Sequence, residues 1–257
     1  MNVLEKIEAT RQKKPLHFTL IDPDRQKPEE AAELAAQAEE WGSDAIMVGG
    51  SQAANIMFLD ETVEKIKQRC RLPVILFPSS HSALTGKADA LFFMSLLNSR
   101  SPRFIIEEQM AGAVVVAQNG LEPLSMAYLI VESGATTSAA WVGDVKPIPR
   151  DKPAFAVGYA LAAKFFGMRF IYLEAGSGAK DTVPEEMVAA VKKALNDSSL
   201  KAGGSEAGKV YVIVGGGIRD AATAQAKIRA GADIIVTGTI AEESRERLKE
   251  IIKAVKG

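Results

Sequence analysis

Three glycine-rich turns near the end of the chain carry the pattern that points most directly to chemistry. They are Tyr172–Gly178 (YLEAGSG), Gly215–Asp220 (GGGIRD) and Thr237–Ile240 (TGTI), and an apolar run precedes each. The second and third turns also open helical patterns, whose unpaired N–H groups and positive dipole ends suit an anion. Glycine has no Cβ, so the backbone can approach a ligand closely. Three such turns in succession predict a phosphate cup at one rim of a barrel.

Tyr172 and Glu174 stand within the first of these turns, two residues apart. Side chains alternate faces along a strand, so these two point the same way and Leu173 points the other way. A carboxylate beside a phosphate suggests a group that binds a hydroxyl or takes its proton. A salt bridge for Glu174 and barrel packing for Tyr172 are the structural alternatives.

Two earlier positions also follow apolar runs directly. Asp22, in Asp22-Pro23-Asp24, has three open roles: metal ligand, general base or helix N-cap. Asp24 is better placed as a cap or turn residue. Ser51, after Gly49-Gly50, offers a hydroxyl to a hard cation or caps the next helix. Carboxylate, hydroxyl and phosphate oxygens suit Mg²⁺, which takes few protein ligands and completes its shell with substrate phosphates and water.

The remaining reactive side chains form no catalytic set. His17 lies inside the first apolar run, where a structural role is expected, and His81 lies in a polar loop without a visible partner. Cys70 ends a helical pattern and reads as an ordinary helix residue. The chain has no P-loop, GGGIRD does not fit the dinucleotide pattern G-x-G-x-x-G, and no Ser/His/Asp arrangement can be argued.

Eight apolar runs alternate with helical patterns and must position these residues. The predicted strands are Leu16–Ile21, Ala45–Val48, Pro73–Phe77, Ala90–Met94, Met126–Val131, Phe170–Leu173, Val210–Val214 and Ile234–Val236. The predicted helices are Pro28–Trp41, Asp60–Cys70, Pro102–Gln118, Asp151–Phe166, Pro184–Leu195, Ala221–Ala230 and Glu242–Val255. This alternation implies parallel pairing, and eight strands in 257 residues favour one α/β domain, a (β/α)8 TIM barrel over residues 1–257.

Two places break the repeat. Pro78–Asp89 is short and polar, so the helix after the third strand is truncated or missing. Ser133–Arg150, after the fifth strand, is an insertion that we expect to form a rim loop carrying Trp141. Ser198–Lys209 reads as a flexible polar connection on the opposite side of the barrel. In such barrels the active site lies at the C-terminal ends of the strands, where the candidate residues stand.

Composition excludes several classes of protein. Net charge is -1, which gives no basic signature of nucleic-acid binding. One cysteine excludes an intrachain disulfide, and with two histidines it makes a His/Cys zinc site a poor hypothesis. No apolar run is long enough for a transmembrane segment, and the N-terminus lacks a signal-peptide core. We expect a soluble cytoplasmic protein.

Taken together, these motifs resemble those of the geranylgeranylglyceryl phosphate synthases, archaeal-type prenyltransferases related to bacterial heptaprenylglyceryl phosphate synthases. The resemblance rests on Asp22-Pro23-Asp24, VGGS (Val48–Ser51), FPSS (Phe77–Ser80), YLEAGSG, VGGGIR and TGT, which span residues 16 to 240. The VGGS motif and the long C-terminal half are most similar to the larger archaeal group.

The resemblance implies a Mg²⁺-dependent enzyme that joins sn-glycerol 1-phosphate to geranylgeranyl diphosphate, the first ether-bond step of archaeal membrane phospholipid synthesis. It implies a homo-oligomer, a dimer or a hexamer, and Asp22 and Ser51 as metal ligands. The glycerol phosphate would be bound by Tyr172, Leu173, Glu174, Ala175, Gly176, Ser177, Gly178, Gly215, Gly216, Gly217, Gly238 and Thr239.

Within this reaction, Glu174 is the candidate to accept or orient the hydroxyl proton, with Tyr172 as helper. Apolar residues such as Phe92, Phe93, Leu96 and Leu97 are candidates for the prenyl groove, although core packing explains them equally. Trp141 and Phe104-Ile105-Ile106 are candidates for a subunit interface.

Three alternatives stay open at the level of sequence. The first keeps the reaction but changes the prenyl chain length. The second is a phosphate-binding barrel enzyme of histidine or tryptophan biosynthesis, although no second Asp or Lys ends another strand convincingly. The third is a non-catalytic protein that binds a phosphorylated ligand.

Overall fold

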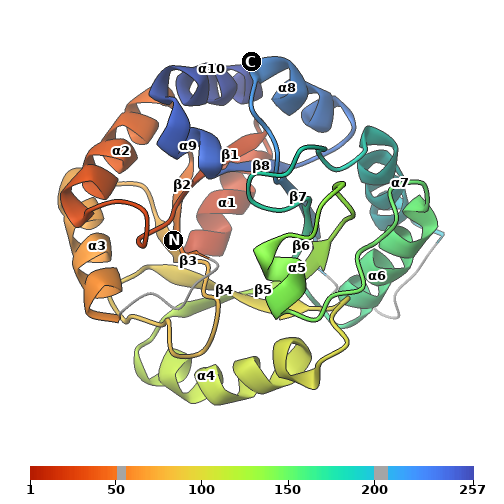
Figure 1. The fold of residues 1–257 in the computed structure, drawn as a ribbon, viewed down its shortest axis with the longest axis horizontal. Helices are drawn as coiled ribbons and strands as arrows, with labels where there is room; N and C mark the ends of the chain where they lie inside the picture. Colours follow the sequence, from red (N-terminus) through yellow and green to blue (C-terminus); the bar gives the residue numbers. More distant parts are fainter. Residues whose placement is uncertain (51–55, 200–207) are drawn as a thin grey trace.

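Eight parallel strands close into a barrel in the computed structural model, which describes residues 1–50, 56–199 and 208–257. The order around the barrel is the order along the chain, and β8 pairs with β1 (Figure 1). The strands are β1 (Leu16–Ile21), β2 (Ala45–Val48), β3 (Val74–Leu76), β4 (Ala90–Leu96), β5 (Glu122–Ile130), β6 (Phe170–Glu174), β7 (Tyr211–Gly215) and β8 (Ile234–Thr237). The predicted α/β TIM barrel is confirmed, and the largest shift is at β5, which starts four residues before its predicted start at Met126.

Helices surround the barrel between most strands. They are α1 (Val3–Arg11), α2 (Pro28–Trp41), α3 (Ile56–Arg69), η1 (Arg103–Glu107), α4 (Glu108–Gln118), α5 (Ser138–Val142), α6 (Pro153–Phe165), α7 (Glu185–Asn196), α8 (Ala221–Arg229), α9 (Thr239–Glu243) and α10 (Arg245–Lys256). The predicted continuous helix over Pro102–Gln118 begins instead with a π-helical turn, η1. The predicted Glu242–Val255 helix is likewise divided, because Ser244 caps the start of α10 with its side chain.

Side chains of the strands alternate between two apolar layers. Leu16, Phe18, Met47, Phe92, Met126, Phe170 and Tyr172 belong to the layer inside the barrel. Ile21, Ile46, Val48, Leu129, Leu173 and Val214 pack outward against the helices. Both faces of each strand are therefore covered, which explains the near-continuous apolar runs in the sequence.

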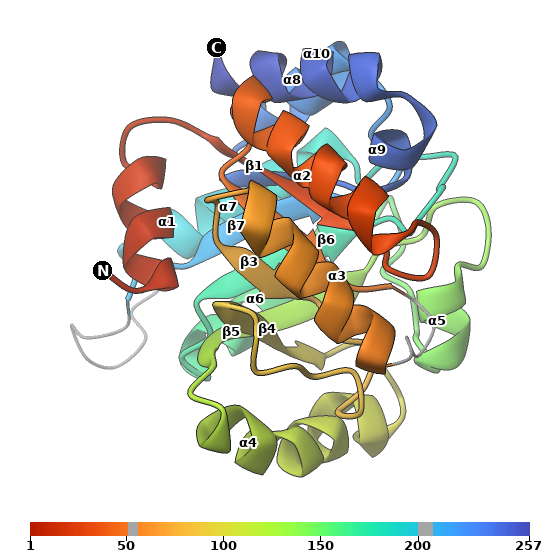
Figure 2. The same cartoon turned by 90° about the vertical axis from the view of Figure 1, so that its left-hand side faces the viewer.

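The N-terminal end of the barrel is closed by α1, a helix that the sequence did not predict. Val3 and Ile7 pack into the inner layer. The N–H groups of Val3 and Leu4 donate to the Glu122 carboxylate at 2.6 and 2.9 Å, so the start of α1 is tied to the start of β5. Figure 2 shows α1 and α5 at opposite ends of the molecule, so the C-terminal end of the barrel remains for the site.

The two predicted breaks in the repeat are present. No helix lies between β3 and β4 over residues 77–89, a fully described stretch. The Ser133–Arg150 insertion carries the short helix α5, with Trp141 79% exposed. Most of the predicted flexible connection Ser198–Lys209 lies outside the described residues.

Candidate active site

The three glycine turns converge on one pocket at the C-terminal end of the barrel, as predicted. The Ser177 hydroxyl lies 3.1 Å from that of Thr239, which joins the first turn to the third. Arg219 donates to the Gly178 carbonyl oxygen at 3.0 Å, which joins the second turn to the first. The pocket lining includes Tyr172, Glu174, Ser177, Gly178, Gly216, Gly217, Gly238 and Thr239.

Glycine is required here because the turns pack directly on the candidate catalytic side chains. Gly216 has φ +83°, and a Cβ there would lie 2.5 Å from a Glu174 carboxylate oxygen. A Cβ at Gly215 would lie 2.2 Å from the Tyr172 hydroxyl. The backbone of the second turn therefore approaches both side chains closely, which a larger residue would prevent.

One part of the predicted anion site is occupied by the chain itself. Asp220 caps α8, and its carboxylate accepts from the Thr223 N–H at 2.7 Å. The start of α8 thus carries its own negative charge, and this part of the helix-start prediction is wrong. The cup is formed mainly by the glycine loops ahead of the helices, where Gly176, Gly178, Gly216 and Gly217 all have positive φ.

Two residues predicted for the cup turn their side chains away from it. Leu173 and Ala175 are fully buried in the outer apolar layer, so their side chains pack toward the helices. Strand alternation produces this arrangement, since Tyr172 and Glu174 occupy the inward positions on either side of Leu173. Gly176 and Gly215 contribute through their backbone, and the Gly176 N–H donates to the Glu174 carboxylate at 2.7 Å.

Glu174 is a buried carboxylate at the edge of the pocket, only 7% exposed. Burial raises its pKa above the ordinary value for glutamate, while hydrogen bonds from Tyr172 and from the Gly176 N–H oppose the shift. No ion pair of Glu174 is found in the described part of the chain, so the salt-bridge alternative has no support there. A carboxylate whose pKa is raised by burial is a stronger base than an ordinary glutamate and is suited to accept a proton.

Tyr172, Tyr128 and Phe77 form an aromatic floor beneath Glu174. The Tyr172 ring centroid lies 5.4 Å from that of Tyr128 and 5.8 Å from that of Phe77. Burial, with the nearby Glu174 carboxylate as the next cause, raises the pKa of both tyrosines well above the usual value. Both phenols are therefore neutral hydrogen-bond donors at physiological pH, and Tyr172 can assist Glu174 only in that role.

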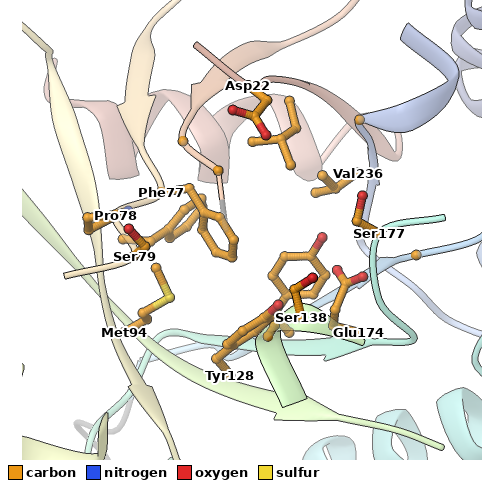
Figure 3. Close-up of a pocket in the computed structure, with 18 of the residues that line it drawn as sticks. Asp22, Phe77, Pro78, Ser79, Met94, Tyr128, Ser138, Glu174, Ser177 and Val236 are labelled. Carbon is orange, nitrogen blue, oxygen red and sulfur yellow. The ribbon is translucent and has the colours of Figure 1, made fainter. Parts of the chain in front are cut away.

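Asp22 faces Glu174 from the opposite wall of the pocket (Figure 3). Its Oδ1 accepts from the Asp24 N–H at 3.0 Å, and its Oδ2 lies 3.5 Å from Arg25 Nε. Gly50 packs against this carboxylate, because a Cβ at Gly50 would lie 2.4 Å from Asp22 Oδ1. Asp24 is a turn residue, and the N-cap of α2 is Lys27, so the cap alternatives for Asp22 and Asp24 are wrong.

The surroundings of Asp22 fit a Mg²⁺ ion that keeps most of its ligands from substrate and water. The small residue Gly50 leaves the carboxylate accessible, and Asp22 lines the same pocket as the phosphate cup. Among residues 1–50, 56–199 and 208–257, no three His, Cys, Asp or Glu side chains converge as a metal cage, and Mg²⁺ does not need one. Ser51, the second predicted ligand, lies outside the described residues.

The pocket also has an apolar arm. The pocket as a whole has a volume of about 310 Å³. Its apolar part is lined by residues of β4, α4 and the loop that replaces the missing helix, including Leu84, Leu91, Phe92, Phe93, Leu96 and Val116. Three of the four predicted groove residues line it, whereas Leu97 packs against the outer layer. No helix lies between β3 and β4 (Figure 1), and residues of the loop that replaces it line this part of the pocket.

The other candidate residues have structural roles. His17 is fully buried between Ser43 and Thr237, with ring nitrogens 3.2 and 3.0 Å from their hydroxyls, and burial lowers its pKa to about 3. His81 has a partner that sequence reasoning missed, because Glu108 on α4 contacts both its ring and its backbone N–H. Cys70 is buried, and burial raises the pKa of its thiol to about 12, which makes it a poor nucleophile.

Several residues that line the pocket were not predicted. Tyr128 lies opposite Tyr172 in the β5–β6 register, and alternation along β5 was the signal for it. Arg25 directly follows the Asp22-Pro23-Asp24 motif, and Arg219 lies within GGGIRD, although neither was named as a site residue. Thr137 and Ser138 come from the insertion, and Thr137 packs on Gly176, which sequence spacing alone does not reveal.

A negative charge placed in the cup tests its assignment. Ser177 lines the pocket from the first glycine turn, with its hydroxyl 3.1 Å from that of Thr239. We expect Ser177→Asp to weaken glycerol phosphate binding by at least ~10-fold, because two like charges in a partly buried site repel each other. Calorimetric titration measures the affinity, with Ser199→Asp on the surface as the control. Unaltered affinity of Ser177→Asp would place the phosphate elsewhere.

In the part of the chain that the structure describes, no helix has the length and apolar character needed to span a membrane.

Comparison with known proteins agrees with this geometry. Residues 7–256 match the PcrB family. The chain is 51% identical to the geranylgeranylglyceryl phosphate synthase of Thermococcus kodakarensis, covering 98% of this chain and 95% of that one. It is 52% identical to the synthase of Methanosarcina acetivorans, with 94% and 93% covered.

A solved structure shows the same barrel. It is the (S)-3-O-geranylgeranylglyceryl phosphate synthase of Thermoplasma acidophilum in complex with its substrate sn-glycerol-1-phosphate. The TM-score is 0.90 at 42% identity, over 100% of this chain and 99% of that one. The chain therefore belongs to the PcrB family, among the geranylgeranylglyceryl phosphate synthases.

Proposed function

We propose that this protein is a prenyltransferase that joins sn-glycerol 1-phosphate to geranylgeranyl diphosphate. The products are 3-O-geranylgeranyl-sn-glyceryl 1-phosphate and diphosphate. The observation that carries the proposal is a single pocket that holds a glycine-rich cup with Glu174 on one wall, Asp22 on the other, and an apolar arm leading away. Family membership favours this reaction over the sugar phosphate barrels of histidine or tryptophan biosynthesis.

The reaction exchanges one C–O bond for another and moves one proton. A C–O bond forms between the free hydroxyl oxygen of glycerol phosphate and C1 of the prenyl chain. The bond from C1 to the diphosphate oxygen breaks, and its electron pair leaves with the diphosphate. We propose that Glu174 accepts the hydroxyl proton, while Tyr172 donates a hydrogen bond to Glu174 and holds it in place.

Orienting the two substrates toward each other accounts for a large part of the proposed rate enhancement. The cup fixes glycerol phosphate through its phosphate, so the free hydroxyl is presented to the prenyl C1 at a defined place. The pocket excludes part of the solvent. Hydrogen-bond donors that line it therefore stabilise the negative charge that develops on the oxygens of the leaving diphosphate. We propose that Asp22, with Ser51, holds Mg²⁺. When bound, this ion stabilises negative charge on the diphosphate.

The apolar arm between β4, α4 and the 77–89 loop is the proposed binding site for the prenyl chain. We expect kcat/KM to be highest for the twenty-carbon diphosphate and to fall for shorter chains, because each buried CH₂ contributes about 0.8 kcal/mol. A ladder of prenyl diphosphates at fixed glycerol phosphate measures this. If kcat/KM is highest at another chain length, the reaction type stands but the preferred prenyl substrate is not geranylgeranyl diphosphate.

We also infer that the protein is a homo-oligomer, a dimer or a hexamer, in the cytoplasm. Exposed aromatic side chains support self-association: Trp141 is 79% exposed, and Phe155, Phe165 and Phe166 at α6 are 58%, 59% and 73% exposed. Of the predicted interface stretch, Ile106 is 60% exposed, whereas Phe104 lines the pocket. Light scattering in solution decides the oligomeric state, and a monomeric mass would overturn this inference.

A further inference from the structure

Arg25 shares a tight turn with Asp22 at the rim of the pocket. The Arg25 N–H donates to the Asp22 carbonyl oxygen at 3.2 Å, and the Asp24 N–H donates to the Asp22 side chain at 3.0 Å. Pro23 occupies the second position, where its fixed φ favours such a turn. The turn therefore holds the Arg25 guanidinium and the Asp22 carboxylate together, with Nε 3.5 Å from Oδ2.

The same guanidinium reaches a second carboxylate across the rim. Arg25 Nη1 donates to Glu242 Oε2 of α9 at 3.0 Å. The Arg25 side chain is 50% exposed, whereas Asp22 and Glu242 are 17% and 20% exposed. An ion pair with a solvated arginine is weak and exchanges readily for a stronger acceptor. Arg25 is thus a half-exposed cation that bridges two more deeply buried carboxylates.

The charged side chains that line the pocket are mostly acidic, and Arg25 is one of the two arginines in the described part of its lining. Five carboxylates of the described chain line it, namely Asp22, Glu108, Glu174, Glu242 and Glu243. Among the described residues, the guanidinium groups that line it are those of Arg25 and Arg219. Arg219 is bound to the cup through the Gly178 carbonyl oxygen, on the glycerol phosphate side. Arg25 stands on the Asp22 side, where the proposed function places the diphosphate of the prenyl substrate.

We propose that Arg25 is a positioning residue for the diphosphate of the prenyl substrate. In the ligand-free chain it bridges Asp22 and Glu242, and with substrate bound it releases Glu242 and donates to the diphosphate oxygens. The planar guanidinium presents paired N–H groups that match a phosphate. As the C1–O bond breaks, the electron pair moves onto the oxygens that Arg25 faces, so the interaction strengthens in the transition state. This inference rests on the proposed prenyl-transfer function.

Inorganic pyrophosphate is the probe for this contact, because it is the leaving group itself. We expect Arg25→Gln to weaken pyrophosphate binding by at least ~10-fold in calorimetric titration with Mg²⁺ present, and to lower kcat by about 100-fold, the typical effect of losing one transition-state donor. Arg25→Lys should recover part of both, since it keeps the charge and loses the paired donors. Affinity for glycerol phosphate should change by less than about 2-fold. Arg71→Gln removes an exposed, ion-paired arginine outside the pocket and should match the wild type in every measurement.

Glu242→Gln separates substrate contact from a structural role. If the Arg25–Glu242 bridge only supports the rim, removing either partner should have the same effect. The proposal instead requires different effects, since Glu242→Gln frees Arg25 and should leave pyrophosphate binding equal to the wild type or tighter, whereas Arg25→Gln weakens it. Unchanged pyrophosphate affinity in Arg25→Gln, or matching losses in both variants, would overturn the proposal while an active wild type keeps the proposed function. A wild type that forms no prenylated product would instead refute the proposed function.

Discussion

Glu174→Gln is expected to lower turnover by about 10²- to 10⁴-fold, the range associated with loss of a general base. Glutamine keeps an oxygen that accepts the Gly176 N–H, so the cup retains its shape. Affinity for glycerol phosphate should therefore change only a few-fold. Steady-state kinetics combined with calorimetric titration measures both quantities, and an unchanged rate would make Glu174 a spectator.

The pH dependence of the same variant gives an independent readout. Burial raises the pKa of Glu174 in the folded chain, so the carboxylate form that accepts a proton is lost as pH falls through that raised pKa. In the pH–rate profile of the wild type, the rate should decrease toward low pH with an apparent pKa above the ordinary glutamate range. The residual rate of Glu174→Gln should not show this decrease.

The stability of Glu174→Gln should move in the opposite direction to its activity. A buried carboxyl with a raised folded-state pKa contributes stability below its unfolded pKa, and this contribution is lost as pH rises through the folded pKa. At neutral pH the charged group thus lowers the free energy of unfolding. We expect Glu174→Gln to have a Tm equal to or above that of the wild type. A large fall in Tm would mean that the charge supports the fold.

Asp22→Asn is the second variant with a large expected effect. Asparagine keeps the oxygen that accepts the Asp24 N–H, so the turn survives, but the charge that would hold Mg²⁺ is lost. We expect a fall in Mg²⁺-dependent turnover of at least ~100-fold, equivalent to roughly 2.7 kcal/mol of transition-state stabilisation. Calorimetric binding of Mg²⁺ with pyrophosphate provides a readout apart from activity and should also weaken.

Asp24→Asn is the matched control for that variant. Asp24 stands in the same turn, is exposed, and contributes its N–H rather than its side chain to Asp22. It should therefore retain wild-type turnover and metal-dependent pyrophosphate binding. Normal activity in Asp22→Asn would remove the metal role from Asp22, whatever the control shows.

The barrel was predictable from sequence because its signals are local and repeated. Each strand is a short apolar run, and eight runs separated by helical patterns leave few alternatives to a closed parallel sheet. The missing helix after β3 was also visible, since Pro78–Asp89 is too short and polar. By contrast, α1 was missed because its apolar face is narrow, and its place depends on Glu122, over a hundred residues away.

The site was predictable to the extent that strand ends and alternation define it. Asp22, Tyr172 and Glu174 follow from those two rules, and the structure brings them to one pocket. Contacts between distant loops did not follow. The Arg25–Glu242 pair joins residues 217 apart, and Thr137 reaches Gly176 from an insertion whose path no local pattern reveals.

Formation of the ether-linked product by the purified protein tests the central claim most directly. The protein would be incubated with Mg²⁺, sn-glycerol 1-phosphate and labelled geranylgeranyl diphosphate, and both the lipid product and released pyrophosphate would be measured. We predict equal amounts of geranylgeranylglyceryl phosphate and pyrophosphate, with neither formed when glycerol phosphate is omitted. Binding of glycerol phosphate without product would indicate a non-catalytic protein, and pyrophosphate release without glycerol phosphate would indicate a hydrolase. Either result would contradict prenyl transfer.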